Sequence, residues 1–310
     1  MRTGSGGIRL SNWIAELQVP ETFHFERNAA YLQRSANECM YRIADGFVYK
    51  AISRGNDTAV MKVGPAAGGL SLELLGSPEG AAARDGLLEA AEAYVREWFD
   101  LDRDLTPFYE LASGDRLLQE PVKQFHGLRL MGIPDLFEAL CWGIIGQQIN
   151  LAFAYTLKRR LVESYGVPVE AEGVTHWLFP EPELIASLSV SDLEPLRMTV
   201  KKCEYLIGAA EVIASGALSK ERLIAAGSLK EAEKLLTGMR GIGPWTAHYA
   251  IMRCLRLPDA FPIDDVGLHN AVKLQLGMDR KPTKPELIAM SEGWRGWEAY
   301  ATFYLWRLLY

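Results

Sequence analysis

The sequence is poor in the features that mark exported, membrane-bound or metal-binding proteins. Its four cysteines are far apart and form no CxxC pair for a metal or redox centre. No stretch approaches the roughly 18 consecutive apolar residues that a membrane span requires. No apolar run follows the arginines of the N-terminal MRTGSGGIRL. We therefore expect a cytoplasmic protein without a metal, a cofactor or a membrane partner.

The sequence also lacks the excess positive charge of a protein that coats nucleic acid. It has 33 Lys and Arg residues against 39 Asp and Glu residues, for a net charge of −6. This balance argues against binding to a polyanion through bulk electrostatics. The acidic excess lies in residues 1–120, whereas residues 121–310 are close to neutral. A polyanionic partner would therefore meet the C-terminal part through local sites.

What the sequence does contain is enough apolar material for two compact domains. Its 310 residues, 49% of them hydrophobic, exceed what one core usually holds. Residues 1–110 show alternating strand patterns, including a hairpin turn at Asp45-Gly46, until helical spacing begins near residue 82. No comparable strand signal follows. We predict an α+β fold with an antiparallel sheet domain at residues 1–110 and an all-helical domain in two lobes at residues 111–310.

Residues 229–255 carry the most informative pattern of the helical part. The spacing predicts a helix over Leu229–Leu236, a glycine-rich turn, and a second helix that opens at Pro244, which together form a helix-hairpin-helix. Gly241 and Gly243 would let the backbone approach a ligand closely, and the N–H groups of the new helix could hold a phosphate without a lysine. A plain helical hairpin whose turn only connects two helices is the alternative.

Two adjacent carboxylates, Asp264 and Asp265, follow the apolar run FPI at the start of another predicted helix. Asp is a favoured N-cap, so one of the two is expected to cap this helix. Adjacent helical residues do not face each other, so the pair is not a proton-sharing dyad. A carboxylate at the edge of a cleft could stabilise a developing positive charge or activate a water, as cleavage of an N-glycosidic bond requires.

These motifs resemble the helix-hairpin-helix DNA glycosylases, specifically the alkylpurine branch typified by bacterial DNA-3-methyladenine glycosylase II. The resemblance covers residues 121–310 in order, through FHGLRLMGIPDLFEALCWGIIGQQI, RGIGPWTAHY, FPIDDVGL and GWRGWEAYATFYLW. Residues 1–110 match more loosely, as the antiparallel sheet domain of this branch. The resemblance implies base flipping and hydrolytic excision of alkylated purines, such as 3-methyladenine and 7-methylguanine, from duplex DNA in base excision repair. An abasic site would remain.

The resemblance also implies roles for individual residues. Asp265 falls on the catalytic aspartate of the family, which leaves Asp264 as the expected helix cap. Trp245 takes the place of the lysine that strand-cleaving glycosylases use, which implies a monofunctional enzyme. Trp245, Tyr249 one turn later, and Trp306 fall on the base pocket, where aromatic faces would favour a cationic base. Core packing is the alternative for these rings.

A second group of residues is expected to contact DNA. The resemblance implies contacts at Gly241, Gly243, Thr246, Gln147 and Gln148. In the family the segment that corresponds to residues 146–150 supplies the side chain that fills the gap left by the flipped base. The sequence leaves open whether Gln148 or Ile149 fills it, and a buried helix glutamine is a further alternative.

The remaining polar and aromatic residues of interest are expected to be structural. Lys158-Arg159-Arg160 resembles a solvated helix end more than a DNA clamp, and His248, His269, Trp294, Trp297 and Tyr300 are assigned to the scaffold. The expected partner is double-stranded DNA with damaged bases, bound by a monomer.

Two other functions remain open at this point. One is a glycosylase for oxidised or deaminated bases, and the other is a non-catalytic helix-hairpin-helix protein that only docks on DNA. Docking would not require an aspartate beside an aromatic pocket. The sequence does not rank the possible lesions.

Overall fold

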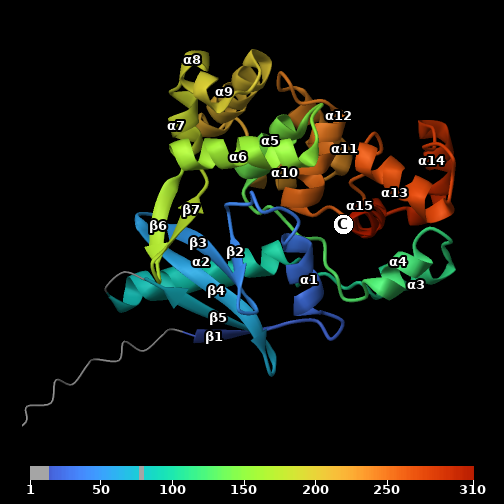
Figure 1. Cartoon of the computed structure of the whole chain (residues 1–310), viewed down its shortest axis with the longest axis horizontal. Coiled ribbons are helices and arrows are strands. Elements are labelled where there is room, and N and C mark those ends of the chain that lie inside the picture. Colours follow the sequence, from blue (N-terminus) through green and yellow to red (C-terminus); the bar gives the residue numbers. More distant parts are fainter. Residues whose placement is uncertain (1–13, 77–79) are drawn as a thin grey trace, which may run out of the picture.

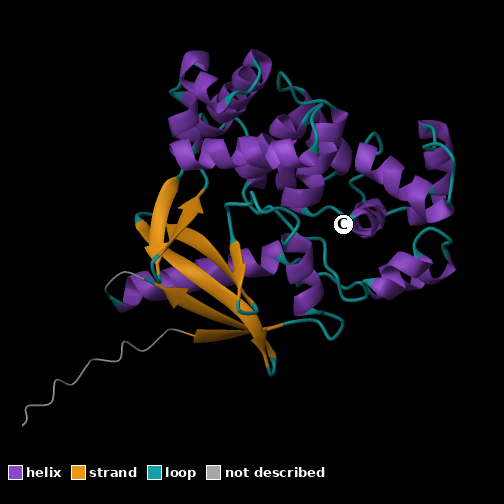
Figure 2. Ribbon diagram, viewed as in Figure 1, coloured by secondary structure: helices purple, strands orange, loops and turns teal. Residues whose placement is uncertain are grey.

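The computed structural model describes residues 14–76 and 80–310, and it opens with an antiparallel sheet (Figures 1 and 2). The five strands lie in the order β1-β5-β4-β3-β2. They are β1 (Ile14–Gln18), β2 (Arg42–Ala44), β3 (Phe47–Arg54), β4 (Asp57–Ala66) and β5 (Gly69–Leu75). Asp45 and Gly46, which join β2 to β3, both have positive φ, as the predicted turn requires. The predicted α+β class is thus confirmed.

One face of the sheet packs on α2 (Ala81–Trp98), the helix that the change in periodicity predicts. Alternate residues of the central strands, such as Val48 and Met61, join Leu87 and Val95 of this helix in the core. Strand residues point alternately to the two faces, so the intervening residues form a second apolar layer on the far side. This layer contains Tyr49, Ala51, Val60, Val169 and Ala171.

The cover of that second face is a hairpin that the sequence analysis missed. Strands β6 (Val167–Ala171) and β7 (Val174–Leu178) interrupt the part of the chain that was expected to be all helical. Glu172 and Gly173 between them have positive φ, as in a tight two-residue turn. Each strand has only five residues, and Pro168 lies in the first, which weakens the strand signal in the sequence.

The helices form two groups, which correspond to the two predicted lobes (Figure 1). The first group holds α5 (Leu136–Gly146), α6 (Leu151–Tyr165), α7 (Pro182–Ala186), α8 (Val190–Leu193), α9 (Val200–Ala214), α10 (Lys220–Ala225), α11 (Leu229–Thr237) and α12 (Pro244–Ala250). The second holds α3 (Thr106–Gly114), α4 (Gln119–Gln124), α13 (Val266–Leu276), α14 (Lys284–Met290) and α15 (Glu298–Trp306). A π-helical turn, Ile251–Leu255, continues α12, and short 3₁₀ turns span Glu194–Leu196, Glu292–Trp294 and Arg307–Leu309.

The sheet domain and the helical domain share one continuous apolar core. Helix α1 (Phe25–Leu32) provides much of the junction, since Tyr31 is fully buried with its ring centroid 4.5 Å from that of Phe303 in α15. Asn28 of α1 accepts a hydrogen bond from the backbone N–H of Arg129 at 2.9 Å. The end of α1 is therefore fixed against the helical domain.

Lys158 lies in this junction, which contradicts the expected solvated helix end. Its Nζ is 3.0 Å from Glu138 and 3.4 Å from Glu38, and all three side chains are buried. Arg159 and Arg160 donate to backbone carbonyls of neighbouring segments. Lys158 and Arg159 therefore join the two domains, whereas Arg160 bonds a carbonyl within the helical domain.

The aromatic residues assigned to the scaffold are confirmed in that role. Trp294 and Tyr300 are fully buried and donate to Asp115 and Asp100, at 2.9 and 2.6 Å. Trp297 packs against the same core.

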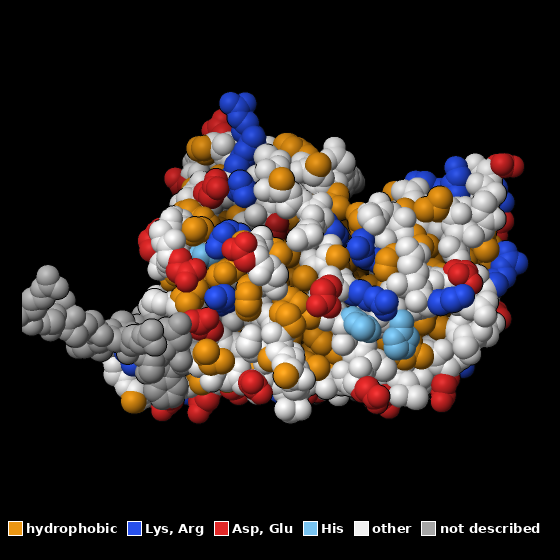
Figure 3. All heavy atoms as spheres, turned by 60° about the horizontal axis from the view of Figure 1, so that its bottom comes forward, with side chains coloured by type: hydrophobic (Ala, Val, Ile, Leu, Met, Phe, Trp, Pro, Cys, Tyr) orange, Lys and Arg blue, Asp and Glu red, His pale blue; other side chains and the backbone are white. Residues whose placement is uncertain are grey.

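One face of the molecule can be examined for charged patches in a space-filling view. Figure 3 shows acidic and basic side chains interspersed over the face in view. No helix within residues 14–76 and 80–310 is long and apolar enough to cross a membrane.

Candidate active site

Four of the predicted site residues meet where α12, α13 and α15 converge. Trp245 and Tyr249 lie in α12, Asp265 is the N-cap of α13, and Trp306 is the last residue of α15. Pro244 occupies the first position of α12, as predicted, so that Trp245 and Tyr249 lie one turn apart on the same face. The structure thus brings together side chains that are up to 61 positions apart in the sequence.

The carboxylate of Asp265 accepts three hydrogen bonds. The indole of Trp245 donates to Oδ2 at 3.0 Å, and the indole of Trp306 donates to Oδ1 at 2.8 Å. The backbone N–H of Leu268 donates to Oδ1 at 2.7 Å, which is the capping bond of α13. All three donors are neutral, so they fix the direction of the carboxylate without neutralising its charge. The arrangement can present a negative charge to a cation.

The expectation that Asp264 caps α13 is wrong. Asp265 is the cap, whereas Asp264 is half-exposed and pairs with Lys284 at 2.8 Å. A cap must direct its side chain back to the N–H three residues on, and here the register of the helix start places the second aspartate there. The same carboxylate therefore caps the helix and faces the tryptophans.

The three aromatic residues form a row. The Tyr249 ring centroid lies 5.7 Å from that of Trp245 and 6.2 Å from that of Trp306. Tyr249 and Trp306 are nearly fully buried and belong to the common core, whereas Trp245 is half-buried. These rings can therefore pack in the core and also form one wall of a base site, because both tryptophans of the row bond the carboxylate of Asp265.

Arg253 supports Tyr249 and was not identified from the sequence. Its Nη1 donates to the Tyr249 hydroxyl at 2.7 Å, and its Nε donates to the Met131 carbonyl at 2.7 Å. Burial raises the pKa of Tyr249, so the hydroxyl stays neutral at physiological pH. The spacing of four residues between Tyr249 and Arg253 could have predicted that the two side chains lie close together on one helix. The sequence gives no sign of the π-helical turn that carries Arg253.

Gly267 is a second residue that sequence reasoning missed. A Cβ atom at this position would lie 2.8 Å from Oδ1 of Asp265 and 3.3 Å from the indole nitrogen of Trp306. Only glycine leaves room for the bond between these two side chains. A glycine within a helix lowers the stability of that helix, so its presence here could have indicated a position with no room for a side chain.

The glycines of the hairpin differ in what they do. Gly241 has a φ of +89°, and a Cβ atom there would lie 2.2 Å from the Tyr205 ring, so this glycine is required by the turn. Gly243, the N-cap of α12, is exposed, and a Cβ atom there would meet open space. The first N–H groups of α12 have no acceptor within the helix, so they face outward beside Gly243.

Gln147 and Thr246, both expected to contact DNA, connect the hairpin to α5 in this structure. Nε2 of Gln147 donates to the Gly241 carbonyl at 2.9 Å and to Thr246 Oγ1 at 3.1 Å. Thr246 is buried, so only its backbone N–H could reach a ligand. Both side chains are used to hold the turn.

Gln148 differs from both of its neighbours. It is exposed and has a φ of +56°, an unusual conformation for a residue other than glycine. Ile149 is half-buried and packs against the core. Backbone strain of this kind is often kept where function needs it.

The two scaffold histidines hold the loop that carries Asp265. His248 Nδ1 accepts from the Phe261 N–H at 2.9 Å, and His269 contacts the carbonyls of Ile263 and Pro282, each at 2.8 Å. Across residues 14–76 and 80–310, no group of three or more potential metal-ligating side chains occurs.

Comparisons with known proteins agree with this geometry. Residues 141–297 match the HhH-GPD superfamily of base excision DNA repair proteins, and residues 16–140 match the N-terminal domain of 8-oxoguanine DNA glycosylase. The chain is 49% identical over 299 residues to a protein of Bacillus subtilis named DNA-3-methyladenine glycosylase, covering 96% of this chain and 98% of that one.

Two further relatives extend the similarity. DNA-3-methyladenine glycosylase 2 of Escherichia coli is 31% identical over 180 residues, which cover 58% of this chain and 60% of that protein. The structure of a 3-methyladenine DNA-glycosylase from Archaeoglobus fulgidus has the same fold, with a TM-score of 0.79, 21% identity, and coverage of 95% of this chain and 97% of that one.

Proposed function

The chain belongs to the HhH-GPD superfamily of base excision DNA repair proteins, and we propose that it excises alkylated purines from duplex DNA with Asp265 as the catalytic carboxylate. The observation that carries this proposal is the Asp265 carboxylate, which two indole N–H groups direct beside the aromatic row. The name of the Bacillus subtilis relative supports an alkylated purine as the substrate. A module that only docks on DNA would not need this arrangement.

The proposed reaction replaces the base by a hydroxyl group. The bond between C1′ and the base nitrogen breaks, and its electron pair leaves with the base. Positive charge develops on the sugar, and the negative Asp265 stabilises it. Water then forms the new C1′–O bond and loses its proton to Asp265 or to solvent. A base that is already cationic leaves as a neutral molecule, so no general acid is required.

The aromatic row would bind the flipped base. Trp245 is the half-buried member of this row and bonds Asp265, while Tyr249 and Trp306 pack beside it. Ring faces at such a site would attract a cationic base by about 0.5–2 kcal/mol per ring. The match to the 8-oxoguanine glycosylase domain concerns residues 16–140, whereas Asp265 and these rings lie outside them. An alkylated purine is therefore the substrate that this pocket favours.

The hairpin would hold the DNA backbone, and Gln148 would fill the gap in the duplex. Gly243 leaves space for a phosphate beside the free N–H groups of α12. Gln148 is exposed in a strained conformation, whereas Ile149 is packed, so we assign the gap-filling role to Gln148. Its amide could hydrogen-bond the base that lost its partner.

The first prediction concerns Asp265. Asp265→Asn removes the charge but keeps a capping side chain, so single-turnover excision should fall by at least about two orders of magnitude while the helix is retained. Asp264→Asn is the matched control, because Asp264 is half-exposed outside the site, and excision should stay within about twofold. Equal losses in both variants would contradict the assignment.

A second prediction concerns the hairpin. Gly243→Val places a side chain where the phosphate would lie, so affinity for every duplex should fall by roughly tenfold, with lesion preference unchanged. Gly114→Val is the control, since a Cβ atom there also meets open space, at the end of α3. Fluorescence anisotropy at several salt concentrations measures both, and the salt dependence should be shallow. A loss confined to one lesion would speak against a phosphate contact.

A third prediction separates the two residues of the gap-filling segment. Gln148→Ala should leave thermal stability unchanged and lower excision from duplex DNA by about tenfold. Flipping a base costs a few kcal/mol, and the variant would lack the side chain that fills the gap and offsets part of this cost. Ile149→Ala should instead lower the melting temperature, since this side chain packs in the core. The reverse pattern would assign the role to Ile149.

The function itself is tested by the products. Methylated duplex DNA should release free methylated purines, and strand breaks should appear only after alkali. Borohydride added during turnover should trap no protein–DNA adduct, because the indole of Trp245, bonded to Asp265, stands where a Schiff-base lysine would be. A trapped adduct would show a second activity, and the absence of any released base would refute the proposed function.

A further inference from the structure

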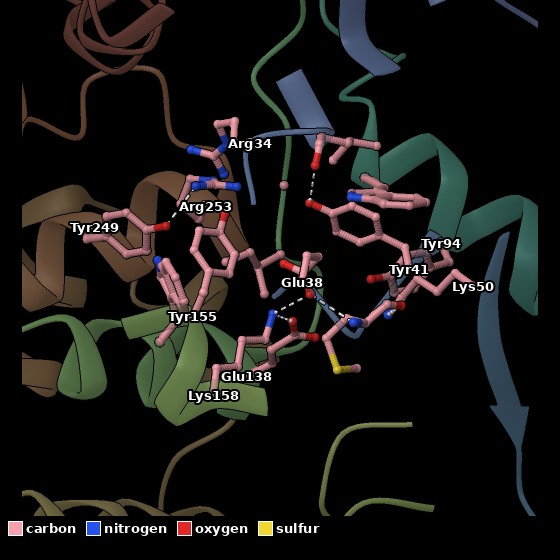
Figure 4. Close-up of a pocket in the computed structure, with 16 residues that line it drawn as sticks. Arg34, Glu38, Tyr41, Lys50, Tyr94, Glu138, Tyr155, Lys158, Tyr249 and Arg253 are labelled. Carbon is pink, nitrogen blue, oxygen red and sulfur yellow. Dashed lines mark hydrogen bonds and ion pairs between the residues drawn. The ribbon is translucent and has the colours of Figure 1, made fainter. Parts of the chain in front are cut away.

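A cavity of about 40 Å³ lies between the sheet domain and α12, and Tyr249 is one of the residues that line it. Figure 4 shows the guanidinium groups of Arg34 and Arg253 close together near Tyr249, among the residues that line this cavity. Arg34 follows α1 in the N-terminal domain, and Arg253 lies in the π-helical turn after α12. Both domains therefore contribute a permanent positive charge beside Tyr249.

The two arginines differ in how their donors are used. Arg253 donates to Met131 and to the hydroxyl of Tyr249. Within the part of the chain that the structure describes, no residue accepts a hydrogen bond from Arg34, and its Nε is buried without a partner. A buried donor without an acceptor is unfavourable. Arg34 therefore has donors available for a ligand.

Aromatic rings hold the Arg34 guanidinium in position. Its Cζ lies 3.8 Å from the centroid of Tyr31 and 5.5 Å from that of Tyr310. The pKa of the Tyr310 hydroxyl is raised, mainly by burial, with a lowering effect of Arg34 and a raising effect of Asp265. Arg34 and Tyr249 line the same cavity, and Tyr249 also belongs to the aromatic row with Trp245 and Trp306. The free donors of Arg34 therefore lie beside the proposed active site.

We propose that Arg34 is a specificity-determining residue that donates hydrogen bonds to the O6 and N7 edge of the flipped purine. This inference rests on the proposed function. The cavity has room for water molecules and not for a purine. The base would therefore lie against Tyr249, and only its edge would reach Arg34.

The chemistry of the two purine edges makes the proposal selective. A guanine-type edge presents two acceptors, O6 and N7, which match an arginine that donates in a bidentate manner. An adenine-type edge presents N7 as an acceptor but an amino group at C6, which also donates. A guanidinium has five donors and no acceptor, so it cannot satisfy the amino group. Arg34 would therefore favour purines with a carbonyl at C6.

The test uses two lesions of equal charge. Duplex DNA treated with dimethyl sulfate contains both 3-methylguanine and 3-methyladenine, which carry the same methyl position and positive charge. Their release from one sample, measured by mass spectrometry, gives the ratio of the two excision rates. The shared substrate also removes differences in protein concentration or DNA affinity.

Arg34→Met should lower the ratio of 3-methylguanine to 3-methyladenine release by about tenfold, as expected for the loss of one bidentate pair. Arg34→Lys should lower it by a smaller factor, because lysine keeps the charge but not the planar pair of donors. Arg54→Met, at an exposed arginine of the same domain, is the control and should leave the ratio unchanged. If Arg34→Met does not fold, as judged by thermal denaturation, Arg34→Lys decides.

Two results would overturn the proposal. An unchanged ratio with both rates reduced would show that Arg34 only supports the packing of Tyr31 and Tyr310. A higher ratio would place Arg34 beside the C2 amino group of guanine, which it would repel. A wild-type protein that releases neither base would refute the proposed function instead, so the two failures are distinguishable.

Discussion

The three hydrogen bonds to the carboxylate of Asp265 are the constraint on which the rest of the site depends. They come from the first turn of α12, the end of α15 and the start of α13. Because all three donors are neutral, they position the carboxylate and leave its charge available. Gly267 contributes by the absence of a side chain, since any Cβ atom would intrude on the bond between Asp265 and Trp306. The geometry therefore makes one carboxylate both the cap of α13 and the charge that the proposed reaction would use.

The elements proposed to bind DNA are connected to this centre by direct contacts. Gln147, at the end of α5, bonds both the Gly241 carbonyl in the hairpin and Thr246 in α12. The adjacent Gln148 is thereby held at a fixed place relative to the hairpin. A phosphate held at the hairpin and a side chain inserted in the duplex would thus act from one rigid unit. Few cationic side chains are needed, which is consistent with a nearly neutral helical domain.

The N-terminal domain contacts the helical domain close to Tyr249. Its helix α1 packs on α15 through Tyr31, and the segment that follows places Arg34 beside Arg253. Lys158 pairs with acids from both domains in the same junction. A like pair of cations beside a tyrosine favours acceptor atoms in a ligand, so the junction is suited to recognise the edge of a base. The aromatic row would recognise the positive charge of the base, and the junction would recognise the acceptor atoms on its edge.

The sequence by itself predicted the α+β class and the helix-hairpin-helix, because these depend on local periodicity and short motifs, and its resemblance to the DNA glycosylases singled out the aspartate and the aromatic residues. It could not decide which aspartate caps α13, because capping depends on where the helix starts to within one residue. It also missed the β6–β7 hairpin, which is stabilised by packing on the sheet. Arg34 and Arg253 meet only through the docking of two domains, since such contacts are set by tertiary packing and leave no local pattern.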